Sequence, residues 1–154
     1  MLKDLIQEKV SSMLKRKVLF IIGDYQKGKT TGVIEYLKDK YGEMWENHYI
    51  DVGLFLQKSI SEEQITLYKI FNQEFENDSV KVVNNLINNN IEKFLVIDHC
   101  EWLFAEKQTE WLKTIFNEAE EKRVVLMVVP NEYKMYVPTN AFSVIEWKGD
   151  NHED

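Results

Sequence analysis

The sequence predicts a single α/β domain in which about five mostly parallel strands lie between two layers of helices, an αβα arrangement. Five short runs are apolar almost throughout, as in parallel strands covered on both faces, and they alternate with stretches of helical spacing. The chain of 154 residues, 44% hydrophobic and 29% charged, has the length and composition of one globular domain. We therefore treat residues 1–154 as one domain.

The N-terminal segment 1–15 is predicted to form an amphipathic helix. From Leu2 to Leu14, apolar residues recur at helical spacing with Lys and Glu between them. The resulting apolar stripe either packs on the domain or meets a partner. The run KVLFII at 17–22 predicts the first strand, 31–40 a helix, and HYIDV at 48–52 the second strand.

The middle of the chain reads as two helices. Residues 61–64 have the pattern of a capping box that opens a helix reaching about Phe75. Another helix is predicted to start at residue 78 or 79 and to end in the asparagine run 88–90. The remaining predicted elements are a strand at 93–98, a helix at 108–121, a strand at 124–129 stopped by Pro130, a strand at 141–147 and a frayed tail at 149–154.

Charge and composition exclude several classes of protein. The chain has 19 Lys and Arg against 26 Asp and Glu, a net charge of −7, which disfavours direct nucleic-acid binding because that needs clustered positive charge. The lone Cys100 cannot form an internal disulfide, no apolar run is long enough to cross a bilayer, and acidic residues stand where a signal peptide is apolar. These features predict a cytoplasmic protein that does not act at a membrane.

The segment after the first predicted strand matches G-x-x-x-x-G-K-[ST], the Walker A pattern of P-loop proteins. Its glycines allow a tight turn whose N–H groups surround phosphate oxygens, and the following helix adds positive potential. Lys29 is expected to reach the β- and γ-phosphates, and Thr30 to offer its hydroxyl to Mg²⁺. The predicted nucleotide-binding residues are Gly23, Asp24, Tyr25, Gln26, Lys27, Gly28, Lys29, Thr30 and Thr31.

Asp98 is the acidic residue expected to complete a magnesium site. It follows the apolar residues 94–97 at the carboxyl end of a predicted strand, which is the Walker B arrangement. Ligands of open α/β folds bind at this edge of the sheet, and Mg²⁺ prefers oxygen ligands. Thr30 and Asp98 are therefore the predicted metal-site residues.

The residues for catalysis leave alternatives open. Glu101 either orients the attacking water or is a solvated carboxylate near the start of a helix. His99, directly after Asp98, is either a polar packing residue or a second candidate base. Asn131 either senses the γ-phosphate or belongs to a turn with Pro130. The candidate catalytic residues are Lys29, Glu101 and Asn131.

One predicted strand lies between the Walker A and proposed Walker B strands, and the sequence has no Asn-Lys-x-Asp guanine motif. In these features the chain resembles the AAA+ and RecA-like P-loop ATPases. The resemblance implies the sheet order 5-1-4-3-2 and ATP with Mg²⁺ as cofactors. The chain departs from that group at His99, where the group has a glutamate, and no C-terminal lid domain is expected. Arg16 and Arg123 each precede a predicted strand, away from bound phosphates.

The segment IDHCEWLF at 97–104, the Walker A pattern and the terminal IEWKG at 145–149 resemble the BrxF family of small P-loop proteins from BREX bacteriophage-exclusion systems. The resemblance covers nearly the whole chain. It implies an ATP-binding component of bacterial anti-phage defence that works as a homo-oligomer or with a larger partner protein. It also carries functional roles onto residues 23–30, Asp98 and Glu101.

Three functions fit these observations. The first is a Mg²⁺-dependent ATPase whose activity needs assembly or a partner. The second is a nucleotide-controlled assembly module with negligible hydrolysis of its own. A third is a degenerate P-loop scaffold, because Tyr25 and Gln26 are larger than the residues common inside such a loop, and Tyr25 would occlude the site.

Overall fold

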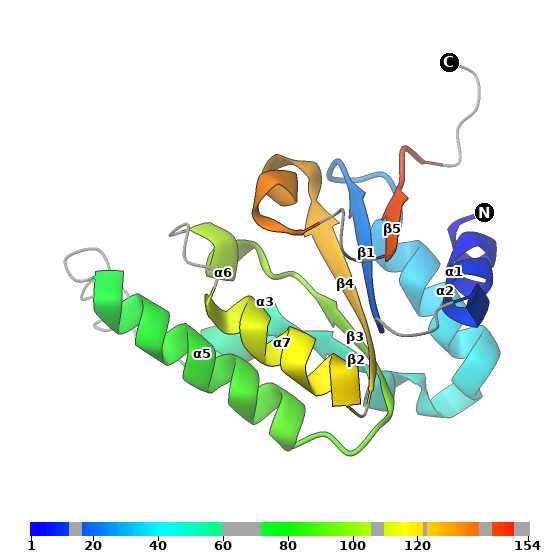
Figure 1. Cartoon of the computed structure of the whole chain (residues 1–154). Coiled ribbons are helices and arrows are strands. Elements are labelled where there is room, and N and C mark those ends of the chain that lie inside the picture. The colour runs from blue at the N-terminus through cyan, green and yellow to red at the C-terminus, as the bar shows by residue number, and fades with distance from the viewer. Residues whose placement is uncertain (13–16, 60–71, 106–109, 122, 139–142, 150–154) are drawn as a thin grey trace.

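The computed structural model describes residues 1–12, 17–59, 72–105, 110–121, 123–138 and 143–149 (Figure 1). Its centre is a five-stranded sheet in which all neighbouring strands are parallel. The strands lie in the order β2-β3-β4-β1-β5, which is the expected order counted from the other edge. They are β1 (Val18–Gly23), β2 (Tyr49–Asp51), β3 (Phe94–Asp98), β4 (Val124–Pro130) and β5 (Ser143–Glu146).

Helices cover both faces of the sheet, as the sequence predicts (Figure 1). On one face lie α1 (Leu2–Ser12) and α2 (Lys29–Tyr41). On the other lie α5 (Asn72–Asn88) and α7 (Glu110–Glu121), side by side. The shorter elements are α3 (Val52–Ser59), α6 (Glu101–Ala105) and the 3₁₀ segments η1 (Gly42–His48) and η2 (Asn131–Tyr136).

Alternate residues of the central strands enter the two cores. In β1, Phe20 and Ile22 pack toward α5 and α7, whereas Leu19 and Ile21 pack toward α1 and α2. Because side chains alternate between the faces of a strand, a strand covered on both sides must be apolar at every position. All six residues of β1 and all five of β3 are buried, which explains their uninterrupted apolar sequence up to Asp98.

The apolar stripe of the N-terminal helix packs on the domain. Leu2 and Ile6 of α1 are buried in the core formed with α2, and Leu5 remains 39% exposed. The two helices approach closely at Gly32, where an added Cβ would lie 2.7 Å from Cδ2 of Leu2. This approach needs a residue without a side chain in α2.

Some predicted boundaries differ from the structure. The expectation of a new helix at Asp78 or Ser79 is wrong, because α5 runs without a break from residue 72 to 88. Its buried residues Val83 and Ile87 join the core shared with α7, and this packing outweighs the local capping tendency of an Asp-Ser pair. The predicted helix start at 61–64, Arg16, and the tail at 150–154 lie outside the described residues.

The register of the strands brings their carboxyl ends level with one another. Gly23 pairs with Pro130, and Asp51 pairs with Asp98. The segments that leave β1, β2, β3 and β4 therefore meet at one edge of the sheet, which is where ligands bind in open α/β folds. Among the described helices, none has the length and apolar character that crossing a membrane requires.

Candidate functional site

The loop that joins β1 to α2, residues 24–28, is the segment predicted to hold phosphates. We call it the β1–α2 loop. Its backbone enters the left-handed region at Gln26, with a φ of 60°, and at Gly28, with a φ of 84°. No atom lies within 4 Å of the place where a Cβ of Gly28 would stand, so its backbone conformation, and not lack of space, favours glycine there.

Lys29 begins α2 and is nearly buried, with 7% of its surface exposed. Its Nζ donates hydrogen bonds of 2.6 Å to the carbonyl oxygens of Gly23 and Asp24. Burial lowers the pKa of Lys29, and the nearby carboxylates of Asp98, Asp24 and Glu101 partly offset this shift. The Lys29 ammonium is therefore held against the loop by two neutral carbonyl oxygens.

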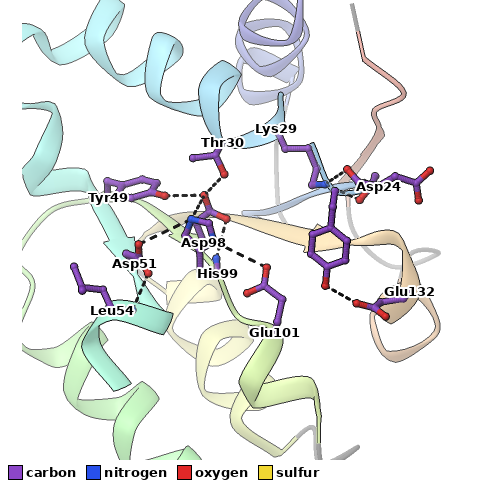
Figure 2. Close-up of polar contacts among 12 residues, drawn as sticks. Asp24, Lys29, Thr30, Tyr49, Asp51, Leu54, Asp98, His99, Glu101 and Glu132 are labelled. Atoms are coloured by element: carbon purple, nitrogen blue, oxygen red, sulfur yellow. Dashed lines mark hydrogen bonds and ion pairs between the residues drawn. The ribbon is translucent and has the colours of Figure 1, made fainter. Parts of the chain in front are cut away.

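Asp98, at the end of β3, is 2% exposed and accepts three hydrogen bonds. Its Oδ2 accepts one from Oγ1 of Thr30 and one from the hydroxyl of Tyr49, each at 2.7 Å. Its Oδ1 accepts one from the backbone N–H of His99 at 2.8 Å. Figure 2 shows these groups around the carboxylate. The predicted metal-site pair, Thr30 and Asp98, is thus in direct contact.

His99 has a φ of 58°, a left-handed conformation that turns the chain sharply as it leaves β3. Its Nε2 lies 3.7 Å from Oδ2 of Asp98 and 3.9 Å from Oδ2 of Asp51. Its Nδ1 lies 4.0 Å from Oε1 of Glu101, the first residue of α6 (Figure 2). The imidazole therefore stands among three carboxylates, and it faces Glu101 across the site.

Tyr25 closes the opposite side of the site. Its hydroxyl donates a hydrogen bond to Oε1 of Glu132 in η2, and its ring centroid lies 5.9 Å from Nζ of Lys29. Burial, reinforced by Glu132, raises the pKa of Tyr25, so the phenol stays protonated and keeps its role as donor. Tyr25 is 52% exposed, and the hypothesis that it occludes the site stays a prediction.

The segments that carry Glu101 and Glu132 are joined by aromatic stacking. Phe104 of α6 stacks on Tyr133 of η2, with ring centroids 5.2 Å apart and planes 13° apart. Tyr136 of η2 also stacks on Phe104, at 6.2 Å. The two glutamates are thus carried by elements that pack on each other beside the site.

These residues surround a cavity of about 370 Å³, which we call the main pocket. It joins most of the predicted loop residues to the acidic end of β3. Its lining residues are Tyr25, Gln26, Gly28, Lys29, Thr30, Thr31, Asp98, His99, Glu101, Val128 and Pro130.

Asn131 does not line the main pocket. It lies at the start of η2 and lines a neighbouring cavity of about 260 Å³ together with Gly23, Asp24 and Trp147. The γ-phosphate-sensing role and the turn role of Asn131 both remain predictions. Asn131 lines a different cavity from Glu101, which lines the main pocket.

Lys29 supplies the one Lys or Arg side chain that lines the main pocket among the described residues. Arg123 precedes β4, as predicted, and donates hydrogen bonds to the carbonyl oxygens of Ile87 and Asn90 at the far edge of the sheet. Across the same described ranges, no group of three or more His, Cys, Asp and Glu is arranged to hold a metal ion. The predicted metal-site pair, Thr30 and Asp98, consists of one hydroxyl and one carboxylate.

The sequence does not predict four residues that make polar contacts in or beside the site: Tyr49, Asp51, Glu132 and Trp147. Tyr49 and Asp51 lie in β2, which the expected strand order places beside β3. The sequence therefore contained the information needed to predict that these two residues lie near Asp98. Glu132 is one residue beyond Asn131, and no sequence pattern pairs it with Tyr25. Trp147 reads as an ordinary apolar residue at the end of a strand.

Comparison of the chain with models of protein families, with curated proteins and with solved structures finds no match.

Proposed function

We propose that the chain binds a nucleoside triphosphate, expected to be ATP, together with Mg²⁺ in the main pocket. The observation that carries the proposal is the 2.7 Å hydrogen bond between Thr30 and Asp98, beside the ammonium of Lys29 and the β1–α2 loop. A hydroxyl next to a carboxylate is an oxygen pair that suits Mg²⁺, and the loop with its lysine suits the phosphates.

The roles of the residues follow from their positions. With nucleotide bound, the N–H groups at the start of α2 would donate to phosphate oxygens, and Lys29 would exchange its bonds with loop carbonyls for bonds with phosphates. Thr30 and Asp98 would hold the metal ion, whose charge would neutralise that of the phosphates. Tyr49 and the N–H of His99 keep the Asp98 carboxylate in place.

Hydrolysis requires a base and a further cation. Glu101 is the candidate base, and it orients water once it turns from His99 toward the γ-phosphate. A cation from a second copy or from a larger partner would complete the site, because among the described residues Lys29 alone supplies a Lys or Arg side chain to the main pocket. The resemblance to BrxF of BREX-like anti-phage systems implies that the chain works in an assembly. The chain is therefore proposed as the ATPase component of such an assembly.

The second function, a nucleotide-controlled assembly module with negligible turnover, is favoured by one observation. His99 lies within 4.0 Å of both Asp98 and Glu101, so the candidate base is held beside an imidazole and not over the phosphate loop. In this case nucleotide binding alone changes the surface offered to a partner.

Calorimetry with MgATP tests nucleotide binding. Lys29→Ala is expected to lower the affinity about tenfold or more, since a hydrogen bond to a charged group contributes roughly 1.5–3 kcal/mol. Asp98→Asn is expected to remove the dependence on Mg²⁺. Lys38→Ala is the matched control, because Lys38 is exposed on the same helix. Absence of binding by the wild-type chain at millimolar MgATP would contradict the proposal.

Phosphate release measured over a series of protein concentrations separates the two functions. Turnover that rises more than linearly with concentration supports an ATPase that needs assembly. Glu101→Gln is then expected to keep MgATP affinity and to slow turnover by orders of magnitude. Binding without turnover at any concentration supports the assembly module instead.

A further inference from the structure

Trp147, the residue directly after β5, contacts both ends of the β1–α2 loop. Its backbone N–H donates to the carbonyl oxygen of Ile22 at 2.8 Å, just before the loop. Its indole Nε1 donates to the carbonyl oxygen of Lys27 at 2.7 Å, near the end of the loop. The Trp147 side chain is 7% exposed and packs in the core beneath α1 and α2. The β1–α2 loop is thus hydrogen-bonded, at Lys27, to an indole ring that is packed in the core.

The backbone around Trp147 also lies directly against the loop. A Cβ added to Gly23 would collide with the carbonyl oxygen of Trp147, so glycine is required there by lack of space. Beyond Trp147, Gly149 lies against Lys27, since a Cβ on Gly149 would be 3.6 Å from Cδ of Lys27. The first glycine of the Walker A pattern therefore serves this close approach.

The indole bond has a directional consequence for the next residue. The carbonyl of Lys27 and the N–H of Gly28 belong to one planar trans peptide unit, so they point in opposite directions. Holding the carbonyl on the indole turns the N–H of Gly28 away from Trp147, and Gly28, unlike Trp147, lines the main pocket. Residues 24–28 are exposed, so burial alone does little to hold this peptide unit in one orientation.

We propose that Trp147 is a positioning residue that holds the β1–α2 loop in its phosphate-binding shape through the indole N–H. This inference rests on the proposed nucleotide-binding function. Trp147 touches no phosphate itself and acts through the Lys27–Gly28 peptide unit. Its effect on binding is therefore separable from its contribution to the core.

The test is Trp147→Phe, which keeps an aromatic ring in the core and removes the donor. Loss of one hydrogen bond of about 1–1.5 kcal/mol predicts an affinity for MgATP reduced about 5- to 12-fold. The amide signal of Gly28 in a ¹⁵N-correlated NMR spectrum is expected to broaden or shift, whereas the signals of β1 stay in place. Tyr36→Phe is the control, because Tyr36 packs in the same core as Trp147 and its hydroxyl pairs with Lys40, away from the loop.

A second variant covers the case in which Trp147→Phe disturbs the core. Incorporation of 3-benzothienylalanine at position 147 keeps the shape of the indole and replaces only the N–H by sulfur. Wild-type affinity and an unchanged Gly28 signal in this variant would overturn the inference. If the wild-type chain binds no nucleotide, the proposed function fails, and the Gly28 signal still decides whether Trp147 positions the loop.

Discussion

The carboxylate of Asp98 accepts hydrogen bonds from three groups, which come from α2, from β2 and from the turn directly after β3. Thr30 and Tyr49 share its Oδ2, whereas the N–H of His99 holds its Oδ1. In the proposed magnesium site, a metal ion held by Oδ2 and Thr30 would replace the bond between them, and Tyr49 would remain as the donor that orients the carboxylate. Burial and Asp98 raise the pKa of Tyr49, so this donor stays protonated.

Tyr49→Phe tests this role at the scale of one atom. The variant keeps the ring and removes the donor to Asp98, so the Mg²⁺ concentration for half-maximal ATP binding is expected to rise about tenfold. A Mg²⁺ titration at fixed nucleotide measures it. Tyr41→Phe is the control, since the Tyr41 ring stacks on His48. An unchanged Mg²⁺ requirement in Tyr49→Phe would remove Tyr49 from the metal site.

At the scale of helices and strands, the sequence predicts most of the sheet because burial on both faces leaves an unbroken apolar run. β1, β3 and β4 were predicted to within one residue at each end. The short helices α3 and α6 were missed because eight and five residues give too little periodicity. The contacts of Tyr25 with Glu132 and of Trp147 with Lys27 join positions more than 100 residues apart, and no local pattern encodes such pairs.

The contact between α1 and α2 gives a prediction at this scale. Gly32→Ala places a methyl group against Leu2, and overpacking is expected to cost about 1–2 kcal/mol of unfolding free energy despite the better helix propensity of alanine. Leu2→Ala removes Cδ2 and Cγ of Leu2 but keeps its Cβ, which lies 2.8 Å from the new methyl group, so it relieves part of the overlap. Gly32→Ala is therefore expected to cost less unfolding free energy in the Leu2→Ala background than in the wild-type chain.

Chemical denaturation of the four proteins in this double-mutant cycle measures the coupling between Leu2 and Gly32. Additive effects of the two substitutions would contradict close packing of the helices at this point. Because Lys29 and Thr30 open the same helix, calorimetry with MgATP on the same four proteins shows whether changes at the contact of α1 with α2 alter nucleotide affinity.

For the whole molecule, stability at alkaline pH depends on buried phenols. Burial raises the pKa of Tyr36, which is 3% exposed, to about 12 from the ordinary value of 10.0. The unfolded chain therefore loses this proton first, so the stabilisation is complete below pH 10 and is lost as the pH rises toward 12. At about 1.4 kcal/mol per pKa unit, this contribution is up to about 3 kcal/mol.

Tyr36→Phe isolates that contribution. Phenylalanine has no proton to lose, so the difference in unfolding free energy between variant and wild type is expected to move in favour of the variant between pH 10 and 12. Denaturation at several pH values measures it. A difference that does not change with pH would show that Tyr36 ionises as readily in the folded chain as in the unfolded one.

The outermost strands of the sheet are short, with three residues in β2 and four in β5, and they end in Asp51 and Glu146. Brief edges that end in negative charge give another chain little backbone to pair with, and like charges repel a second copy. Growth of one continuous sheet across several molecules is therefore disfavoured. Copies that associate are expected to meet through helices or through the rim of the main pocket, which leaves each sheet at five strands.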